Sequence, residues 1–379
     1  MKPKIAVVCA YNPGNSGMYS VDLAAVDFFS SIDCEFNLFM TQSPMRGIGT
    51  LKKYIPTRFL QLKKVKIGTM TFRLLKDLEQ LNGYSHIVYW GDFINNPVYG
   101  KHDFSVRDVF FGISETETEA FQRWIKLFAP ENLNPNIKIA SIGNNFQHKF
   151  DIEDTDTNSV FNTFERNFDL ILPRDSYSLD NLRQFLPNLP PSKLDAGIDC
   201  AFLLHKNQAA KKMNQFACLF KRTQLDDIGS LIEGLNRHTG LSSTRLDNWL
   251  SLKRHSADKM FNTNIETVAC STFVLTDTYH VCVNAMRLGV PVFAIGRKSK
   301  NQEGTVGDFK KKTLFEMFNA SQFYFTIDEN EDEYEFYQNV IEKIHEFISS
   351  PTNIYDEIQD SMSRQQVSFK EKIIKFIEN

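Results

Sequence analysis

The sequence lacks a strong net charge and a long apolar run. Its N-terminal apolar run is too short for the core of a secretion signal, so we expect it to form a first strand instead. Its 43 Lys and Arg residues nearly balance 46 Asp and Glu residues, giving a formal net charge of -3. This balance gives no electrostatic reason to expect nucleic acid as the main partner. No window approaches the roughly 18 uninterrupted apolar residues of a membrane span. We expect a cytoplasmic protein without a membrane span, and peripheral contact with the inner face of the membrane is left open.

Cysteine is scarce and scattered, and no two cysteines form a Cys-x-x-Cys pair. Several lie in apolar runs, which indicates buried free thiols in a reducing compartment. No cluster of His, Asp, Glu or Cys has the spacing of metal ligands, so we predict neither a metal site nor a bound cofactor. The six cysteines are Cys9, Cys34, Cys200, Cys218, Cys270 and Cys282.

Short β-rich runs alternate with helix-length segments along the whole chain, a pattern typical of βαβ units with mostly parallel sheets. In the first half we predict strands at Lys4–Ala10, Phe36–Thr41, His86–Trp90, Ile137–Ile142 and Leu170–Leu172. The helices expected between them are Tyr19–Ile32, Thr71–Leu81, Glu115–Phe128, Asn158–Asn167 and Ser176–Phe185.

The length of 379 residues suits two domains better than one. The polar stretch KNQAAKKMN at residues 206–214 marks the expected boundary, between a first domain over 1–205 and a second over 215–379. The second half is expected to have strands at Phe216–Phe220, Ser243–Leu246, Phe273–Leu275, Val292–Ile295 and Phe323–Thr326. Its expected helices are Ile228–His238, Tyr279–Leu288, Phe309–Phe318, Asp332–Ile348 and a long last helix at Ile354–Ile377.

The stretch TDTYHVCVNAMRLGVPVFAIG predicts a strand end, a short turn, a helix and a further strand. It places His280 in the first turn of the helix, shortly after Asp277 and Thr278. Ligands of parallel sheets bind where strands end, and helix N-termini favour anions. A histidine there can move a proton near neutral pH. A packed histidine without chemistry is an equally good interpretation.

A second group of cations follows another strand of the same half. Lys221 and Arg222 end the run CLFKRT. Two adjacent cations at a strand end would suit an anionic ligand. The alternative is an ordinary solvated pair.

Three predicted strand ends of the first half carry groups suited to a sugar. A Gly-containing loop follows the first strand, YWGDFINNP combines an aromatic ring with Asp and Asn, and RDSYS brings a cation after a third strand. Turn chemistry explains the same residues equally well. The candidates are Asn15, Ser16, Gly17, Trp90, Asp92, Asn95 and Arg174.

Taken in order, these segments resemble the polysaccharide pyruvyl transferase family. The C-terminal block matches best, with TDTYH followed by LGVPVFAIG at residues 288–296. Three other segments also resemble the family, although none is highly specific alone. They are the loop Asn15–Gly17, the pair RDSYS with GIDCAFLL (residues 197–204), and GDFKKKTLFEMF at residues 307–318.

The resemblance implies a fold of the GT-B glycosyltransferase type, with two Rossmann-like domains facing across a cleft. It also implies transfer of the enolpyruvyl unit of phosphoenolpyruvate, a co-substrate, onto two hydroxyls of a sugar, which gives a cyclic pyruvate ketal and phosphate. The acceptor is then a surface polysaccharide, a glycan or an activated sugar bound to the first domain, with the donor in the second. His280 matches the functional histidine, and Asp277 is the nearest acidic residue to orient it. The candidate donor-binding residues are Lys221, Arg222, Thr278, Tyr279 and Arg297.

The sequence departs from the family pattern at three positions. Thr278 stands where the family often has arginine, Val281 where it often has glycine, and Met18 where it often has an acidic residue. Two alternatives therefore stay open: a nucleotide-sugar glycosyltransferase on the same fold, and a non-catalytic sugar-binding relative. A homo-oligomer is compatible with the sequence.

Overall fold

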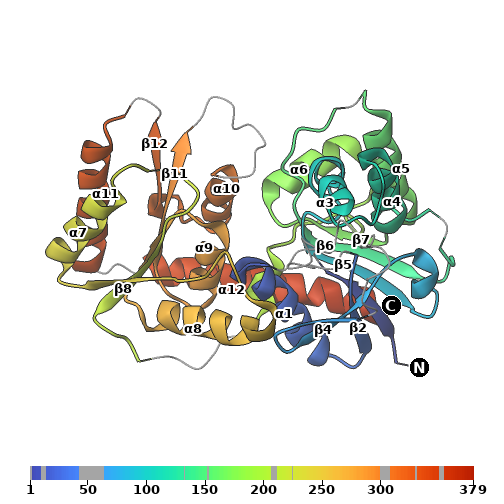
Figure 1. Ribbon diagram of the computed structural model, residues 1–379, viewed down its shortest axis with the longest axis horizontal. Helices are drawn as coiled ribbons and strands as arrows, with labels where there is room; N and C mark the ends of the chain where they lie inside the picture. Colours follow the sequence, from blue (N-terminus) through green and yellow to red (C-terminus); the bar gives the residue numbers. More distant parts are fainter. Residues whose placement is uncertain are drawn as a thin grey trace. The chain divides into compact units, whose positions relative to one another are not determined.

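The chain divides into two compact units, unit 1 and unit 2 (Figure 1). Unit 1 consists of Met1–Leu204, Leu252–Asp258 and Ser368–Asn379, and unit 2 of His205–Ser251 and Lys259–Val367. The structure is a computed structural model that describes residues 2–9, 14–41, 64–131, 133–151, 153–205, 211–223, 225–298, 308–328, 331–349 and 354–379.

The observed units differ from the predicted domains in two segments of the second half. Residues 252–258 and 368–379 belong to unit 1, whereas the sequence assigned all of 215–379 to the second domain. Residues 206–210 of the predicted boundary lie outside the described residues, as does Ala10 at the end of the first predicted strand. The predicted cleft between two facing domains stays a prediction.

Unit 1 is built on a seven-stranded sheet in the order β3-β4-β2-β1-β5-β6-β7. All neighbouring strands are parallel except β3 and β4. The chain leaves β1 toward β2 on one side and later adds β5 on the other, so the strand order reverses between β1 and β5. The strands are β1 (Lys4–Val8), β2 (Glu35–Met40), β3 (Lys64–Ile67), β4 (Met70–Leu74), β5 (His86–Asp92), β6 (Lys138–Asn144) and β7 (Leu170–Leu172).

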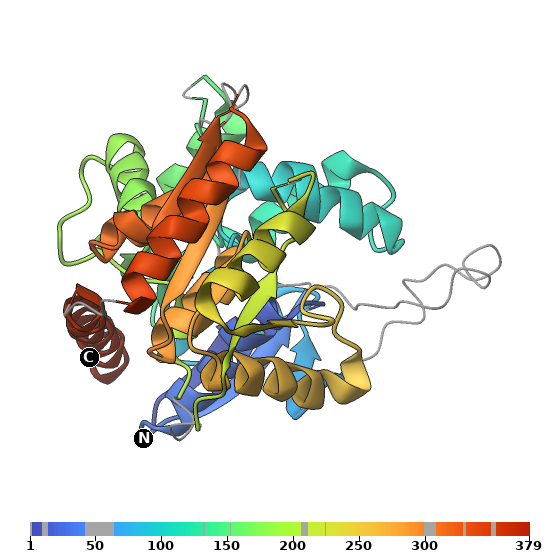
Figure 2. The same cartoon turned by 90° about the vertical axis from the view of Figure 1, so that its left-hand side faces the viewer.

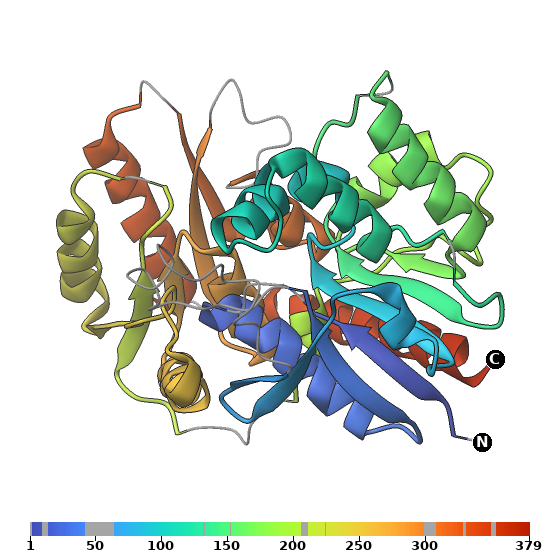
Figure 3. The ribbon, with the colours of Figure 1, turned by 45° about the vertical axis from the view of Figure 1, so that its right-hand side comes forward.

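Helices cover both faces of this sheet (Figures 1 and 3). One face packs its apolar side chains, among them Val8, Tyr89 and Ile139, into a single core with α4 (Glu117–Phe128), α5 (Thr155–Asn167) and α6 (Ser176–Phe185). The alternate residues of the strands point to the other face. There α1 (Ser16–Ser30) packs Phe28 against Trp90, and Phe376 near the C-terminus contacts His86. Burial on both faces explains why these strands are almost continuously apolar.

The predicted helix at Thr71–Leu81 is wrong. The segment forms strand β4 and then a short 3₁₀ helix at Leu78–Leu81. Strand β4 alternates buried and exposed residues and pairs antiparallel with β3 across a turn at Gly68, whose φ is +56°. A period of two over five residues is too short to be told from helix periodicity, which explains the error. The short helices α2 (Pro97–Tyr99), η4 (Gly100–Phe104) and α3 (Ser105–Phe110), and the longer α8 (Ala257–Cys270), were not predicted.

Unit 2 contains a five-stranded, fully parallel sheet in the order β12-β11-β10-β8-β9. The chain runs from β8 to β9 on one side and then returns to place β10 on the other side of β8. The order therefore reverses between β8 and β10, which is where open parallel sheets bind ligands. The strands are β8 (Gln215–Leu219), β9 (Ser242–Arg245), β10 (Val274–Thr276), β11 (Val292–Lys298) and β12 (Tyr324–Asp328).

The helices of unit 2 pack closely on this sheet. Helices α7 and α11 lie side by side on one face (Figure 2), where a Cβ atom on Gly234 would come within 2.4 Å of Ile341 Cδ1. Glycine thus permits the close approach of the two helices. No helix of the described residues is long and apolar enough to cross a membrane. The helices are α7 (Ile228–Thr239), α9 (Tyr279–Arg287), α10 (Phe309–Met317), α11 (Glu333–Ser349) and α12 (Ile354–Glu378), whose residues from Ser368 on belong to unit 1.

The α/β class with mostly parallel sheets is confirmed by this architecture. Several predicted elements also have the right limits. Strand β7 and helix α6 coincide with their predictions, and α9 ends before Gly289, whose φ is +74°.

Candidate functional site

The predicted donor-binding residues gather at the carboxyl edge of the sheet in unit 2. Residues 221–223 follow β8, and residues 277–280 follow β10, its neighbour across the reversal of strand order. Since all strands of this sheet are parallel, these strand ends meet at one edge. The site therefore stands on two adjacent βα turns of one unit.

Asp277 joins the two turns through its side chain. Its carboxylate accepts hydrogen bonds from the backbone N–H of Lys221 (2.8 and 3.0 Å), Arg222 (2.6 Å) and Thr223 (2.9 Å). The hydroxyl of Thr278 donates to the same carboxylate at 3.0 Å. Asp277 is 2% exposed, so these charge-assisted bonds are shielded from water. They fix the backbone that carries the two cations.

This geometry corrects the expected role of Asp277. The sequence suggested that it orients the His280 ring or caps the helix, but its described bonds go to the loop after β8. The N-cap residue of α9 is Thr278, whose hydroxyl bonds to Asp277 and not to the helix. Asp277 therefore acts as an anchor for the loop.

The side chains of Lys221 and Arg222 are exposed, whereas Thr223 is buried. The loop thus combines a fixed backbone with two cationic groups in solvent. Such a loop can present charge to an anion without reorganising its backbone.

His280 lies in the first turn of α9 and is partly buried. Its ring stands edge-on to that of Tyr279, with 5.1 Å between centroids and 80° between planes. Tyr279 is 5% exposed, and the ammonium of Lys310 lies 5.4 Å from its ring centroid. The sequence analysis missed Lys310, which brings a third cation close to the start of α9.

Cys282 lies two residues after His280 but is not a nucleophile in this state. The thiol is fully buried and donates to the carbonyl of Thr278 at 3.5 Å. Burial raises the pKa of Cys282 to about 12, so it stays a thiol at neutral pH. His280 is thus the group of the α9 start that is suited to proton transfer near neutrality.

Arg297 has a structural role in unit 2. Its guanidinium pairs with Glu333 at 2.7 Å and contacts the carbonyl of Thr223 at 3.4 Å. Its backbone N–H donates to Asp308 at 2.8 Å. Arg297 therefore stabilises the loop after β8 through its hydrogen bond to Thr223. Its contact with a donor stays a prediction.

The predicted acceptor residues belong to unit 1, where they lie after β1, in or just after β5, and after β7. Asn15 is the N-cap of α1 and accepts from Met18 N–H at 2.9 Å. Ser16 and Gly17 are buried in the first turn of α1. These residues form a helix start at the reversal between β1 and β5, the position that favours a ligand.

Trp90 and Asn95 are core residues, which corrects their expected exposure to a sugar. Trp90 is 0% exposed, donates its indole N–H to Val21 O at 2.8 Å and packs on Phe28 and Phe29. Asn95 is also 0% exposed and donates to Phe128 O at 2.8 Å. Neither presents a face to solvent. The alternation of β5 points Trp90 toward α1, a direction that its position in the sequence did not reveal.

Replacing Trp90 with phenylalanine tests this placement. The substitution removes one buried hydrogen bond and leaves a small gap, so we expect a loss of about 1–3 kcal/mol in unfolding free energy. Denaturant unfolding measures this loss. Titration with acceptor glycans should show unchanged affinity, and a clear loss of affinity in a folded variant would restore Trp90 to the binding surface.

Asp92 ends β5 in an unusual conformation and stays a candidate. Gly91 and Asp92 both have positive φ, 72° and 57°, which costs energy at a non-glycine residue. Asp22 on α1 is fully buried, and burial, then the charge of Asp92, raise its pKa well above the usual range. We therefore expect the Asp22 carboxyl to be neutral at neutral pH.

Arg174 is held inside unit 1 by carboxylates. It is 1% exposed and lies 3.8 Å from Asp175 and 3.7 Å from Asp199. Its guanidinium also lies 5.3 Å from the ring centroid of Phe93. The charge of the Arg174 guanidinium is thus compensated by carboxylates within unit 1. Because this side chain is buried, the structure does not support the expected contact with a sugar.

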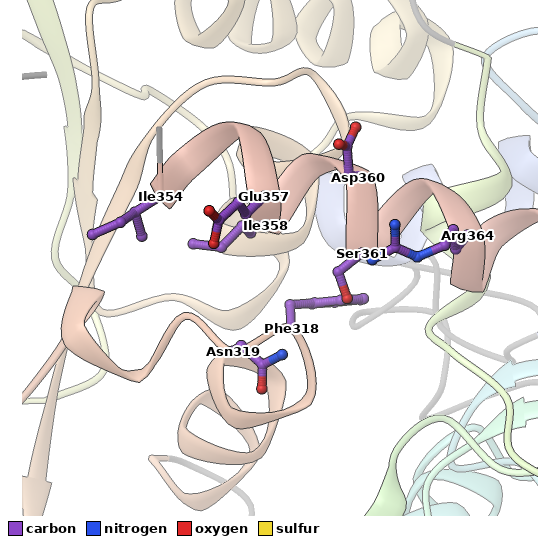
Figure 4. A pocket seen from close by; sticks show the side chains of 8 residues that line it. All are labelled: Phe318, Asn319, Ile354, Glu357, Ile358, Asp360, Ser361 and Arg364. Atoms are coloured by element: carbon purple, nitrogen blue, oxygen red, sulfur yellow. The ribbon is translucent and has the colours of Figure 1, made fainter. Parts of the chain in front are cut away.

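A separate cavity of about 370 Å³ lies in unit 2 between the end of α10 and the start of α12 (Figure 4). No predicted site residue lines it. Among the described residues, no three His, Cys, Asp or Glu side chains are grouped as metal ligands. The side chains around the cavity are Phe318, Asn319, Ile354, Glu357, Ile358, Asp360, Ser361 and Arg364.

Two Rossmann-like units, each with a mostly parallel sheet and a reversal of strand order, make this an α/β protein. The family model described as polysaccharide pyruvyl transferase matches residues 70–299, more than half of the chain. The protein therefore belongs to the polysaccharide pyruvyl transferase family and is a transferase. No curated protein sequence matches the chain.

Several solved structures align with most of this chain. A UDP-GlcNAc 2-epimerase from Neisseria meningitidis bound to UDP-GlcNAc has a TM-score of 0.48 and 10% identity, over 98% of this chain and 100% of that one. A UDP-GlcNAc 2-epimerase from Methanocaldococcus jannaschii has a TM-score of 0.47 and 10% identity, over 96% and 99%. An alpha-glucosyltransferase in complex with UDP and DNA has a TM-score of 0.47 and 10% identity, over 100% of both chains. At such identities nothing about substrate follows.

Proposed function

We propose that the protein transfers the enolpyruvyl unit of phosphoenolpyruvate onto two hydroxyls of a sugar, forming a cyclic pyruvate ketal. The sugar belongs to a surface polysaccharide or to its precursor. The observation that carries the proposal is the fixed loop of Lys221 and Arg222. Its backbone N–H groups donate to the carboxylate of Asp277, which lies three residues before His280 in the sequence. Family membership supports the same reaction.

The donor carries a carboxylate and a phosphate, and the edge of unit 2 offers matching charges. The exposed side chains of Lys221 and Arg222 can form charge-assisted hydrogen bonds with these anions. Arginine binds two oxygens of a phosphate or carboxylate at once. The start of α9 adds the positive end of a helix dipole. We assign the phosphate to this edge, where its charge is also stabilised as it leaves.

The reaction removes one proton from each of two sugar hydroxyls. One proton is added to the methylene carbon, and the other leaves with the phosphate. A sugar hydroxyl bonds to C2 of the enolpyruvyl unit, its proton is taken up, and a proton is added to the methylene carbon. The second hydroxyl then bonds to the same carbon, loses its proton and displaces phosphate. His280 can carry one of these protons because imidazole exchanges protons near neutral pH.

The acceptor sugar is assigned to the carboxyl edge of the sheet in unit 1. Asp92 ends β5 at the reversal of strand order, and Asn15 is the N-cap of α1 beside the same reversal. A carboxylate and an amide can hold sugar hydroxyls by accepting and donating hydrogen bonds.

Replacing Arg222 with alanine should raise the dissociation constant of phosphoenolpyruvate at least about tenfold, since a charge-assisted pair of bonds is lost. Calorimetric titration measures the change. The loss should shrink at high salt because exposed charges are screened. Arg237→Ala is the matched control: Arg237 is exposed in the last turn of α7, just before β9 begins, and so lies toward the amino edge of the sheet. Equal effects of the two variants would mean that Arg222 contributes only to the general surface charge.

Phosphate release from phosphoenolpyruvate, measured with a panel of glycans and activated sugars, tests the reaction itself. Transfer predicts release that depends on the acceptor, with a ketal on the product by mass spectrometry. Release of a nucleotide from a nucleotide sugar would instead identify a glycosyltransferase. Sugar binding without release of either would indicate a non-catalytic relative.

A further inference from the structure

Helix α10 carries three consecutive lysines with three different environments. Lys310 lies over the ring of Tyr279, and Lys312 is exposed and lies 3.6 Å from Glu316. Lys311 is 0% exposed. A fully buried lysine is rare unless its charge is paired and its hydrogen bonds are made.

The ammonium of Lys311 contacts groups of three neighbouring strands or of the turns that follow them. It donates to the carbonyl of Asp277 after β10 and to that of Ile295 in β11, each at 2.7 Å. It lies 3.5 Å from the hydroxyl of Thr223 after β8. Its charge is paired with Asp308 at 2.6 Å. One cation thus bridges β8, β10 and β11 at the edge where the site stands.

Asp308 extends this network to the backbone. Its carboxylate accepts from Arg297 N–H at 2.8 Å and lies 3.5 Å from the Thr223 hydroxyl. Its own carbonyl accepts from the hydroxyl of Tyr324 at 3.1 Å. Apart from Asp308, the N-cap of α10, the groups that Lys311 contacts lie just after β10, within β11 and in the loop that carries the two cations.

Stability alone is a weak reason for such a pair. Moving an ammonium and a carboxylate out of water costs about as much as their attraction returns, and apolar replacements of buried pairs are often neutral. An apolar side chain cannot hold the Asp277 carbonyl, the Ile295 carbonyl and the Thr223 hydroxyl at fixed positions around one point. The arrangement thus fits a requirement for geometry at the site.

We propose that Lys311 is a positioning residue of the donor site, an inference that rests on the proposed function. It fixes the main chain of Asp277, and the Asp277 carboxylate in turn fixes Lys221–Thr223. Lys311 needs no contact with the donor. It sets the spacing between the cationic loop and His280 through hydrogen bonds to main-chain groups.

Lys311→Met tests the proposal with two measurements. Hydrogen exchange of the Lys221, Arg222 and Thr223 amides should accelerate at least about tenfold, because their acceptor is no longer held. The dissociation constant of phosphoenolpyruvate should rise by a similar factor. Lys312→Met is the matched control on the next residue and should change neither. Because Lys311→Met leaves Asp308 unpaired, Lys311→Met/Asp308→Asn is measured beside it as a variant without the buried charge.

The outcomes separate positioning from general stability. Faster exchange confined to the loop supports the proposal, whereas uniformly faster exchange across the β10 and β11 amides contradicts it. Unchanged loop exchange in the folded double variant also contradicts it. In an Arg222→Ala background, Lys311→Met should add little to the loss of affinity, because both act through one loop. If the wild-type protein does not bind phosphoenolpyruvate, the proposed function fails, and the exchange measurement still decides the role of Lys311.

Discussion

Replacing His280 with alanine should slow phosphate release at least about a hundredfold, the scale of general acid–base catalysis. The protein should still fold, because the ring is only partly buried and stands at the start of a helix. Steady-state assays with phosphoenolpyruvate and an acceptor measure the rate, and circular dichroism checks the fold. His345→Ala is the matched control, since His345 is exposed on α11.

His280→Gln separates proton transfer from binding. Glutamine can hydrogen bond from a similar position, but it cannot exchange a proton near neutral pH. The glutamine variant should therefore be nearly as slow as the alanine variant, with donor affinity retained. Activity close to that of the wild-type protein would show that His280 only packs or binds.

Replacing Asp277 with alanine should have the largest effect on unit 2. It leaves the N–H groups of Lys221, Arg222 and Thr223 without their acceptor in a shielded place. Each unsatisfied group costs about 1–3 kcal/mol, so we expect a loss of at least about 3 kcal/mol of stability or failure to fold. Urea unfolding measures the loss.

Asp277→Asn is the milder variant that keeps the prediction testable in a folded protein. The amide retains one acceptor oxygen but turns an NH₂ group toward backbone donors, so the loop should loosen. Phosphoenolpyruvate affinity should fall at least about tenfold, with a smaller loss of stability than for alanine. Asp227→Asn is the control: Asp227 is the exposed N-cap of α7 and should affect donor binding little. Unchanged donor affinity in Asp277→Asn would contradict the role of Asp277 as an anchor.

Much of the fold could be predicted because local signals agree with burial. The run STFVL followed by Thr276, Asp277 and Thr278 predicts a buried strand and then a helix start, and Gly289 predicts its end. Alternation of such segments predicts a parallel sheet, and a parallel sheet predicts which residues share an edge. Membership of the family could be predicted from the order of the motifs.

The partners of each side chain could not be predicted. Asp277 looks like a helix cap in the sequence, but its carboxylate oxygens accept hydrogen bonds from backbone N–H groups of a loop 54–56 residues earlier in the chain. Trp90 looks like an exposed platform for a sugar, but the pleat of β5 turns it into the core. One signal for Lys311 was present: with Leu314 and Phe315 it lies on the apolar side of a helix, where a lysine indicates a buried partner.

Calorimetric titration of the wild-type protein with phosphoenolpyruvate, beside nucleotide sugars, tests the central claim most directly. The claim is that the loop fixed by Asp277, together with the start of α9, binds this donor. We expect saturable binding of phosphoenolpyruvate that weakens in Arg222→Ala and persists in Arg237→Ala. Binding of a nucleotide sugar with no heat from phosphoenolpyruvate would contradict the claim.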